Sequence, residues 1–206
     1  MIAYLDCFSG ISGDMLLGAL LDAGLAIADL RSDLATLPLE GYEVTSERVA
    51  RGGIVGTQVT VRTQHEHGHR GLPDILAIID GADLPPKVAA LARRVFERLA
   101  EAEARVHGRS VEEVHFHEVG AVDAIVDIVG ACCGLERLGV EKLYVSPLPL
   151  GGGWVDSAHG RLPVPAPATV ELLRGVPSHG GPVEEELVTP TGAAIVTPLA
   201  SAFGPR

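Results

Sequence analysis

Aromatic residues are scarce in this 206-residue sequence: they make up 4% of it, although hydrophobic residues of all kinds make up 47%. The core must therefore be built mainly from Val, Ile, Leu and Ala. Long apolar runs are also missing, since none approaches the ~20 residues that span a bilayer. Residues 15–21 are apolar, but Asp6 and Asp14 precede them and no basic segment does, unlike a secretory signal. We expect no membrane partner.

Cysteine is nearly absent. The three cysteines are Cys7, Cys132 and Cys133, and an odd set with two adjacent members is a poor disulfide framework. No Cys-x-x-Cys pair occurs, which argues against a cysteine-based zinc knuckle. The simplest interpretation is a reducing compartment, so the sequence predicts a cytoplasmic protein with Cys132 and Cys133 in its core.

Basic residues are outnumbered. The sequence has 16 Lys and Arg against 27 Asp and Glu, giving a formal net charge of −11. Such a charge argues against nucleic acid or an anionic membrane surface as a main partner. It suits metal cations, and it leaves room for a small phosphorylated ligand held by a local loop.

What is present is an alternation of strands and helices. Residues 2–5 have the pattern of a buried strand, and residues 42–49 and 54–61 that of two strands joined by a Gly-Gly turn. This alternation predicts an α/β (mixed α+β) fold with a mixed sheet, helices packed on it and one antiparallel hairpin.

The strongest helical pattern covers residues 87–107, where apolar residues recur at helical spacing. We interpret His107, in the last turn, as a favourable C-terminal charge rather than a ligand. No repeat and no clear linker divides the chain. We expect one domain over residues 1–206, with two lobes, 1–80 and 81–206, as the alternative.

Residues 147–167 are rich in Gly and Pro and predict a long irregular segment. Segments of this kind inside a compact chain are usually functional or disordered. Trp154, His159 and Arg161 are candidates for lining a pocket there.

Residues 114–127 contain the densest group of chemically active side chains. His115 and His117 lie two apart on a predicted strand and therefore point to the same side, and Glu118 follows. Asp123 and Asp127 lie four apart and share one face of the predicted helix 119–138. One interpretation is a polar strand edge with acids near a helix start. The other, which we favour for the whole cluster, is a divalent-metal or acid/base site.

A Gly- and Ser-rich loop joins the first strand to the first predicted helix. This layout directs backbone N–H groups and a helix N-terminus at an anion, although the lysine of a P-loop is absent. The alternative is a tight turn with Ser12 or Asp14 as the helix N-cap. Asp6 and Asp14 follow the strand, a common location for α/β sites, and are candidate ligands or catalytic carboxylates. The candidate anion or cofactor contacts are Ser9, Gly10, Ser12 and Gly13.

A short His-rich tract occupies residues 65–69. Its histidines are His65, His67 and His69. Short His-rich tracts are compositional indications of metal binding, and a loop of this kind can capture an ion and hand it over. The alternative is a mobile loop without a ligand.

Six strings spread over nearly all of the chain carry a resemblance to a known family. They are residues 6–15, 65–69, 100–108, 115–123, 159–169 and 189–193. In these strings the sequence resembles the nickel insertion protein family (LarC) of nickel-pincer cofactor synthesis.

The resemblance implies an activity and its cofactors. Family members insert nickel into pyridinium-3,5-bisthiocarboxylic acid mononucleotide, which gives the organometallic cofactor of lactate racemase and related enzymes. The reaction depends on CTP, assisted by a divalent ion such as Mn or Mg. We expect His115, His117 and Glu118, with Asp123 as an additional candidate, to hold or deliver nickel. The tract at residues 65–69 would feed the ion, and residues 10–13 would take the phosphate of the mononucleotide.

The sequence departs from the family in two respects. Family members continue into a C-terminal domain associated with CTP binding, so we expect this sequence to be the N-terminal part. Members also often have a longer His-rich insertion. The resemblance implies a nickel chelatase, a lyase, whose complete activity needs the C-terminal domain as well. A homo-oligomer is a further expectation for the partners of this chain. The alternatives are a non-catalytic nickel carrier module and a metal-dependent hydrolase of a phosphorylated small molecule.

Overall fold

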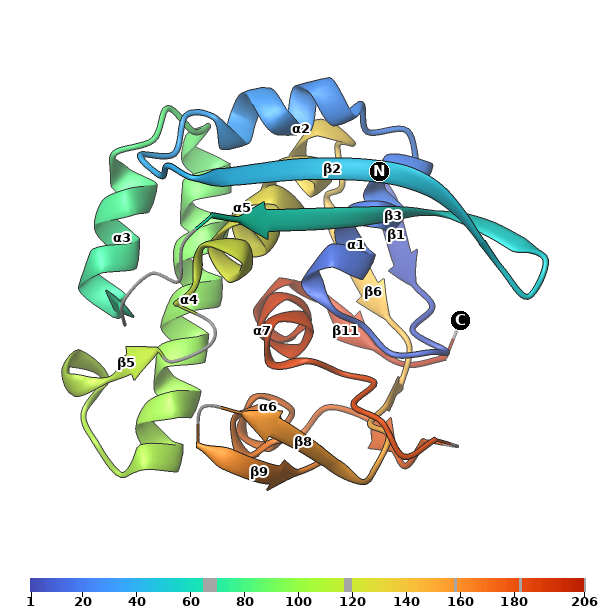
Figure 1. The fold of residues 1–206 in the computed structure, drawn as a ribbon, viewed down its shortest axis with the longest axis vertical. Helices are drawn as coiled ribbons and strands as arrows, with labels where there is room; N and C mark the ends of the chain where they lie inside the picture. Colours follow the sequence, from blue (N-terminus) through green and yellow to red (C-terminus); the bar gives the residue numbers. More distant parts are fainter. Residues whose placement is uncertain (65–69, 117–119, 158, 182, 206) are drawn as a thin grey trace.

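The structure is a computed structural model, and it describes residues 1–64, 70–116, 120–157, 159–181 and 183–205. Helices form much of the centre of the molecule (Figure 1). They are α1 (Gly13–Asp22), α2 (Ile27–Leu34), α3 (Leu72–Asp80), α4 (Pro86–His107), η1 (Val111–Glu113), α5 (Val122–Arg137), α6 (Pro167–Leu172) and α7 (Pro190–Leu199). Within the described residues, no helix has the length and apolar character needed to cross a membrane.

The strands are distributed over several small sheets. The largest described sheet is parallel and has the order β1-β6-β11. Strands β2 and β3, of ten residues each, form an antiparallel hairpin. The strands of these two sheets are β1 (Ile2–Leu5), β6 (Lys142–Val145), β11 (Ala202–Phe203), β2 (Tyr42–Arg51) and β3 (Ile54–Thr63). The remaining strands are β4 (Arg70–Gly71) with β5 (His115–Phe116), β7 (Leu148–Pro149) with β10 (Ser178–His179), and β8 (Trp154–Ser157) with β9 (Gly160–Pro163).

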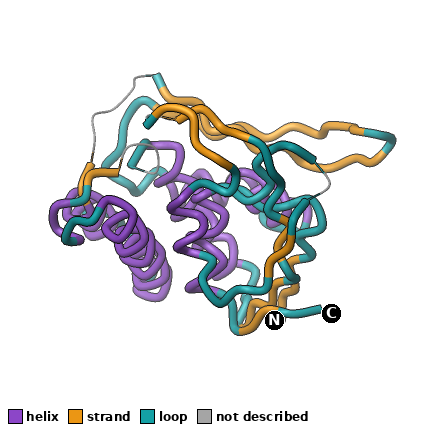
Figure 2. Tube along the Cα trace, turned by 90° about the horizontal axis from the view of Figure 1, so that it is seen from below, coloured by secondary structure: helices purple, strands orange, loops and turns teal. Residues whose placement is uncertain are grey.

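The α/β class and the antiparallel hairpin are confirmed. At the hairpin tip Gly52 and Gly53 both have positive φ, which is what a type I′ turn requires. Figure 2 shows the hairpin running along one side of the helices. Residues 147–167 differ from the expected irregular segment, because they contain β7 and the β8–β9 hairpin.

Helix α5 lies at the centre of the core. Its side chains Ile125, Ile128 and Val129 are fully buried, as are Cys132 and Cys133. Where α5 meets α1, a Cβ added at Gly130 would lie 3.1 Å from a methyl group of Leu17, so only a glycine fits without displacement. This close approach packs the middle of α1 against the middle of α5.

Candidate functional site

Two helix N-termini are held side by side at the end of the first strand. Backbone hydrogen bonds join the segment before α1 to the segment before α7: Ile11 N–H donates to Leu187 O at 2.8 Å, and Thr189 N–H donates to Ile11 O at 3.1 Å. Gly192 is packed so closely that an added Cβ would lie 2.8 Å from the carbonyl carbon of Ile11. The main chains of α1 and α7 thus start almost in contact.

Each of these helices has a hydroxyl N-cap. Ser12 Oγ accepts from Met15 N–H at 3.4 Å and donates to the carboxylate of Asp14. Thr189 Oγ1 accepts from Gly192 N–H at 3.1 Å, so Thr189 caps α7. The prediction that Ser12 or Asp14 would cap the first helix is confirmed for Ser12.

The start of α5 adds carboxylates to these N-termini and completes a cleft of about 370 Å³, the acidic cleft. Strand β3 forms its other wall. The cleft is lined by Ser12, Gly13, Asp14, Gln58, Val59, Thr60, Val61, Asp123, Asp127, Thr189 and Thr191. The predicted candidates Ser12, Gly13, Asp14 and Asp123 therefore do meet in one place.

Asp127 is the most enclosed carboxyl group of the acidic cleft. Its Oδ1 is shielded from solvent and has no hydrogen-bond partner among the described residues, while the backbone N–H of Asp14 donates to the same carboxyl group. Burial, together with the nearby carboxylates of Asp14 and Asp123, raises the pKa of Asp127 to about 8. A phosphate entering this cleft would face like charges, whereas a divalent cation would be attracted.

A second pocket lies beyond the C-terminal end of α4. Gly108, with a φ of 62°, ends α4 in the left-handed conformation, so that His107 stands in the last turn. The chain then passes through η1 and reaches His115 on β5. This pocket, the imidazole pocket, has a volume of about 220 Å³ and is lined by His107, Arg109, Glu113, Val114, His115 and His159.

The rings of His107 and His159 face each other in the imidazole pocket. Their centroids are 5.0 Å apart and their planes are inclined by 49°. Glu103 Oε2 lies 3.4 Å from His107 Nε2, one helical turn earlier on α4. His159 is held by the β8–β9 turn, where its backbone N–H donates to Ser157 Oγ at 3.1 Å.

The structure distributes the predicted site residues over these two places. Asp123 lines the acidic cleft, whereas His115 lines the imidazole pocket. Asp6 and Ser9 are exposed, and Gly10 packs against the backbone of Leu187. The predicted metal residues His65, His67, His69, His117 and Glu118 lie outside the described residues.

Two residues near His115 were not predicted as ligands. His107 had been interpreted as a C-terminal charge and His159 only as a pocket-lining residue, and neither expectation linked them. The available signal was that each precedes a glycine inside one of the strings quoted above. Within the part of the chain that the structure describes, no three His, Cys, Asp or Glu side chains are grouped closely enough to hold a metal ion by themselves.

Comparisons with known proteins agree on one family. The family model described as nickel insertion protein matches residues 3–206. Two relatives from Desulfitobacterium hafniense, strains DCB-2 and Y51, are each 59% identical over 203 residues and are both named pyridinium-3,5-bisthiocarboxylic acid mononucleotide nickel insertion protein. A relative from Dictyoglomus thermophilum is 48% identical over 198 residues and carries nickel insertion protein as a provisional name.

These matches cover the chain but not the relatives. They include 98% of this chain and 50% of each D. hafniense protein, and 96% of this chain and 51% of the D. thermophilum protein. The chain thus spans about half the length of the curated relatives it matches. No solved structure matches it.

Proposed function

The chain belongs to the nickel insertion protein family, and from this premise we propose that it acts in the insertion of nickel into pyridinium-3,5-bisthiocarboxylic acid mononucleotide. The product is the nickel-pincer cofactor of lactate racemase-type enzymes. Nickel is a substrate of this reaction, so the protein must bind the ion and then release it to the organic ligand. The reaction class is that of a lyase, a nickel chelatase, working in the cytoplasm.

The observation that supports this proposal best is the imidazole pocket. His115, a predicted nickel residue, lines it together with His107 and His159. Imidazole suits nickel, and a set of imidazoles without thiolate holds the ion less tightly than a cysteine site would. We propose that His115 receives nickel at this pocket, that His117 and Glu118, which lie outside the described residues, are further nickel ligands, and that the tract at residues 65–69 delivers the ion.

The carboxylates have a separate proposed role. Formation of a nickel–carbon bond releases a proton from the pyridinium ring, and Asp6, Asp14, Glu118 and Asp123 are the candidate acceptors. The acidic cleft, with a shielded Asp127 Oδ1 that has no partner among the described residues, fits a divalent ion such as Mn or Mg, because these ions prefer oxygen ligands. Such an ion would let residues 9–13 approach the substrate phosphate despite the surrounding negative charge.

We propose that CTP is bound by a partner of this chain. The curated relatives are about twice as long as this chain, and we propose that their other half binds CTP with its metal ion and docks on this chain. Complete turnover would then require both halves, and assembly of two copies of this chain would not replace the second half.

Nickel binding tests the proposal directly. We expect an anaerobic competition titration of the purified chain to give about one tightly bound nickel per chain. The His115→Ala/His117→Ala double variant should lose it, whereas the exposed His179→Ala should serve as a matched control with unchanged affinity. Equal affinity of the double variant and the wild type would remove the two histidines from the site.

Insertion itself is tested by mass spectrometry of the mononucleotide. The chain is incubated with nickel, CTP, Mn and the substrate, alone and together with the second half of the D. hafniense relative. Appearance of the nickel adduct only when both halves are present supports the proposal. Nickel binding with no adduct in either mixture would indicate a carrier module, and release of phosphate without CTP would indicate a hydrolase.

A further inference from the structure

A third pocket, the apolar pocket, lies beside the imidazole pocket and is not used by the reasoning above. It has a volume of about 240 Å³ and is lined by residues of the end of α4, the start of α6 and the β8–β9 hairpin. Val106, Leu162 and Pro167 are among the residues that give it mostly apolar walls. His107 and His159 line this pocket as well as the imidazole pocket, so the pair forms a shared wall.

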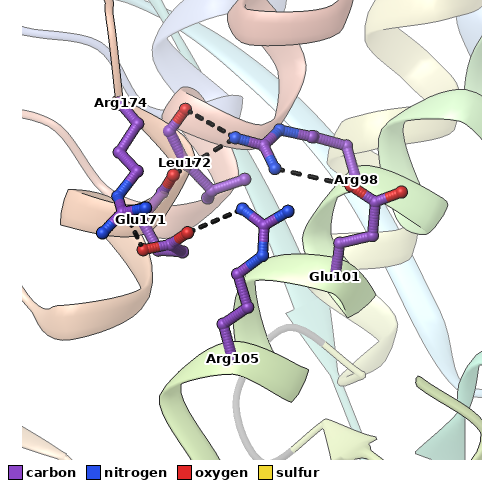
Figure 3. A network of polar contacts seen from close by, with 6 residues as sticks. All are labelled: Arg98, Glu101, Arg105, Glu171, Leu172 and Arg174. Atoms are coloured by element: carbon purple, nitrogen blue, oxygen red, sulfur yellow. Dashed lines mark hydrogen bonds and ion pairs between the residues drawn. The ribbon is translucent and has the colours of Figure 1, made fainter. Parts of the chain in front are cut away.

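The walls of the apolar pocket are fixed by a polar network between α4 and α6 (Figure 3). Arg98 donates to the carbonyl oxygens of Glu171 and Leu172 at 3.2 and 3.3 Å, which are C-terminal groups of α6. Arg105 donates to the carboxylate of Glu171 at 2.7 Å, and Arg174 lies 3.2 Å from it. The two helices are therefore held together and the pocket is preformed.

One carboxylate stands in these otherwise apolar surroundings. The side chain of Glu103 is only 16% exposed and lies 3.4 Å from His107 Nε2. An apolar pocket with a single fixed negative charge suits a flat ring that carries one positive charge, because the ring is desolvated while its charge is compensated. A cavity of ~150 Å³ accommodates benzene, so the volume here leaves room for ring substituents.

We infer that the apolar pocket binds the pyridinium ring of the mononucleotide substrate, and that His107 and His159 present nickel to that ring across the shared wall. The inference rests on the proposed function, since it assigns a binding place to the substrate of that reaction. Arg109, on the imidazole-pocket side of the wall, offers a cation to the anionic substituents of the ring.

The geometry of the histidine pair agrees with joint coordination of one ion. Two imidazoles that bind one first-row ion through bonds of ~2.1 Å have ring centres roughly 4.5–6 Å apart. The observed separation of 5.0 Å lies in this range. Glu103 can orient the His107 ring through the nitrogen that does not bind metal, as carboxylates beside metal-bound histidines commonly do.

A pair of imidazoles is an incomplete metal site, and this suits a transfer step. The described residues supply no third ligand grouped with the pair. The remaining donors must come from water, from the incoming substrate or from residues outside the described ranges. Sulfur atoms of the two thiocarboxylates would displace water and draw the ion from the imidazoles onto the ring.

Ring binding is tested without nickel. The probe is nicotinic acid mononucleotide, which has a pyridinium ring, and ribose 5-phosphate is the matched ligand that lacks the pyridinium ring. Calorimetry should show at least about tenfold tighter binding of the first ligand by the wild-type chain. Leu162→Trp, which fills the pocket, should weaken it about tenfold, whereas Val170→Trp, an exposed valine of α6, should not.

Folding is monitored by circular dichroism, and Val106→Phe is a second pocket-filling variant if Leu162→Trp is unfolded. Glu103→Gln should also weaken the binding of nicotinic acid mononucleotide, whereas the affinity for ribose 5-phosphate should not change. Equal binding of the two ligands, or wild-type binding by folded pocket-filling variants, would overturn the inference.

The histidine pair is tested by nickel titration. His107→Ala/His159→Ala should bind nickel at least about tenfold more weakly than the wild type, whereas the exposed His179→Ala should bind it equally well. Unchanged nickel affinity would remove the pair from the transfer path. Pocket-dependent ring binding in a chain that never yields a nickel adduct would sink the proposed function and leave the ring pocket standing, so the two failures are distinguishable.

Discussion

At the scale of single residues, Asp127 is the side chain whose ionisation depends most on the fold. Its pKa, raised to about 8 mainly by burial, means that the folded protein holds a proton which the unfolded chain releases at much lower pH. Between the ordinary carboxyl range and pH 8 the folded state therefore binds more protons, and stability must fall as pH rises.

Asp127→Asn should remove this dependence. We expect urea denaturation of the metal-free variant to show a gain in stability over the wild type that grows by about 4 kcal/mol between pH 5 and pH 8, because the amide imitates the protonated acid. Asp83→Asn, at an exposed position outside the acidic cleft, is the matched control. A variant whose stability varied with pH as the wild type does would show that Asp127 is ionised in the folded protein.

Gly13 is the residue that makes room for Asp127. A Cβ at this position would lie 2.6 Å from the Cβ of Asp127, and we expect Gly13→Ala to cost about 1–3 kcal/mol of folding free energy. Gly204→Ala, where an added Cβ meets nothing within 4 Å, should cost far less. The test is a double-mutant cycle with Asp127→Gly, which removes the Cβ atom: additive effects of the two substitutions would contradict a direct steric conflict.

At the scale of elements, the attachment of α6 to α4 depends on Arg98. Its side chain is 23% exposed, and its guanidinium donates to two carbonyl groups at the C-terminal end of α6. Arg98→Met, which keeps the apolar stem, should therefore lower stability by about 1–2 kcal/mol and weaken pyridinium binding as the pocket loosens. Arg94→Met, at an exposed position on α4, is the control, and equal melting temperatures for the two variants would rule out the anchoring role.

The same element contact has a pH dependence of known sign. The hydrogen bond from Arg105, helped by Arg174, lowers the pKa of Glu171. The stabilisation is therefore present above the ordinary carboxyl pKa and is lost as the pH falls through the lowered value. Melting temperatures below pH 5 should drop less for Glu171→Gln than for the wild type, since the variant has no such interaction to lose.

Elements with a local cause were predictable from the sequence. The long helix α4 follows from apolar spacing and a terminal glycine, and the β2–β3 hairpin from alternation around Gly52 and Gly53. The described part of the strand expected at His115 is only the two-residue β5, and η1 precedes it. A capping box between Ser110 and Glu113 turns the chain into η1, and the sequence contained that signal.

The pockets were less predictable, because they depend on contacts between distant segments. His107 and His159 are separated by 52 residues, and only the packing of α6 and the β8–β9 hairpin against α4 brings their rings together. By contrast, Ser12, Gly13, Asp14 and Asp123 were each nominated as site residues from their places near helix starts, but their meeting in one cleft was not predicted. A periodic pattern shows where a helix begins but not which helix ends face each other.

At the scale of the whole molecule, the three thiols are isolated from solvent. Cys7, Cys132 and Cys133 are 5%, 0% and 1% exposed, and burial raises the pKa of Cys7 to about 11 and of Cys133 to about 12. Thiolate, the reactive form, is therefore rare in the folded protein. A thiol reagent should label these residues only after denaturation, and pretreatment with iodoacetamide should leave nickel binding unchanged.

Mass spectrometry of the labelled protein checks this prediction. Three modified cysteines should be found after treatment in guanidinium chloride and none after brief treatment under native conditions. Loss of nickel binding together with native labelling would point to a thiolate ligand instead of imidazoles.

Because the imidazole pocket and the apolar pocket share a wall, the binding affinities of their two ligands are linked. His107 and His159 can hold only one arrangement at a time, so an ion on one side and a ring on the other must affect each other. Thermodynamic reciprocity makes this effect symmetric: whatever factor the ion contributes to ring affinity, the ring contributes to ion affinity. Two partners that each bind weakly alone would then be retained chiefly as a pair, and the protein would commit nickel only when its acceptor has arrived.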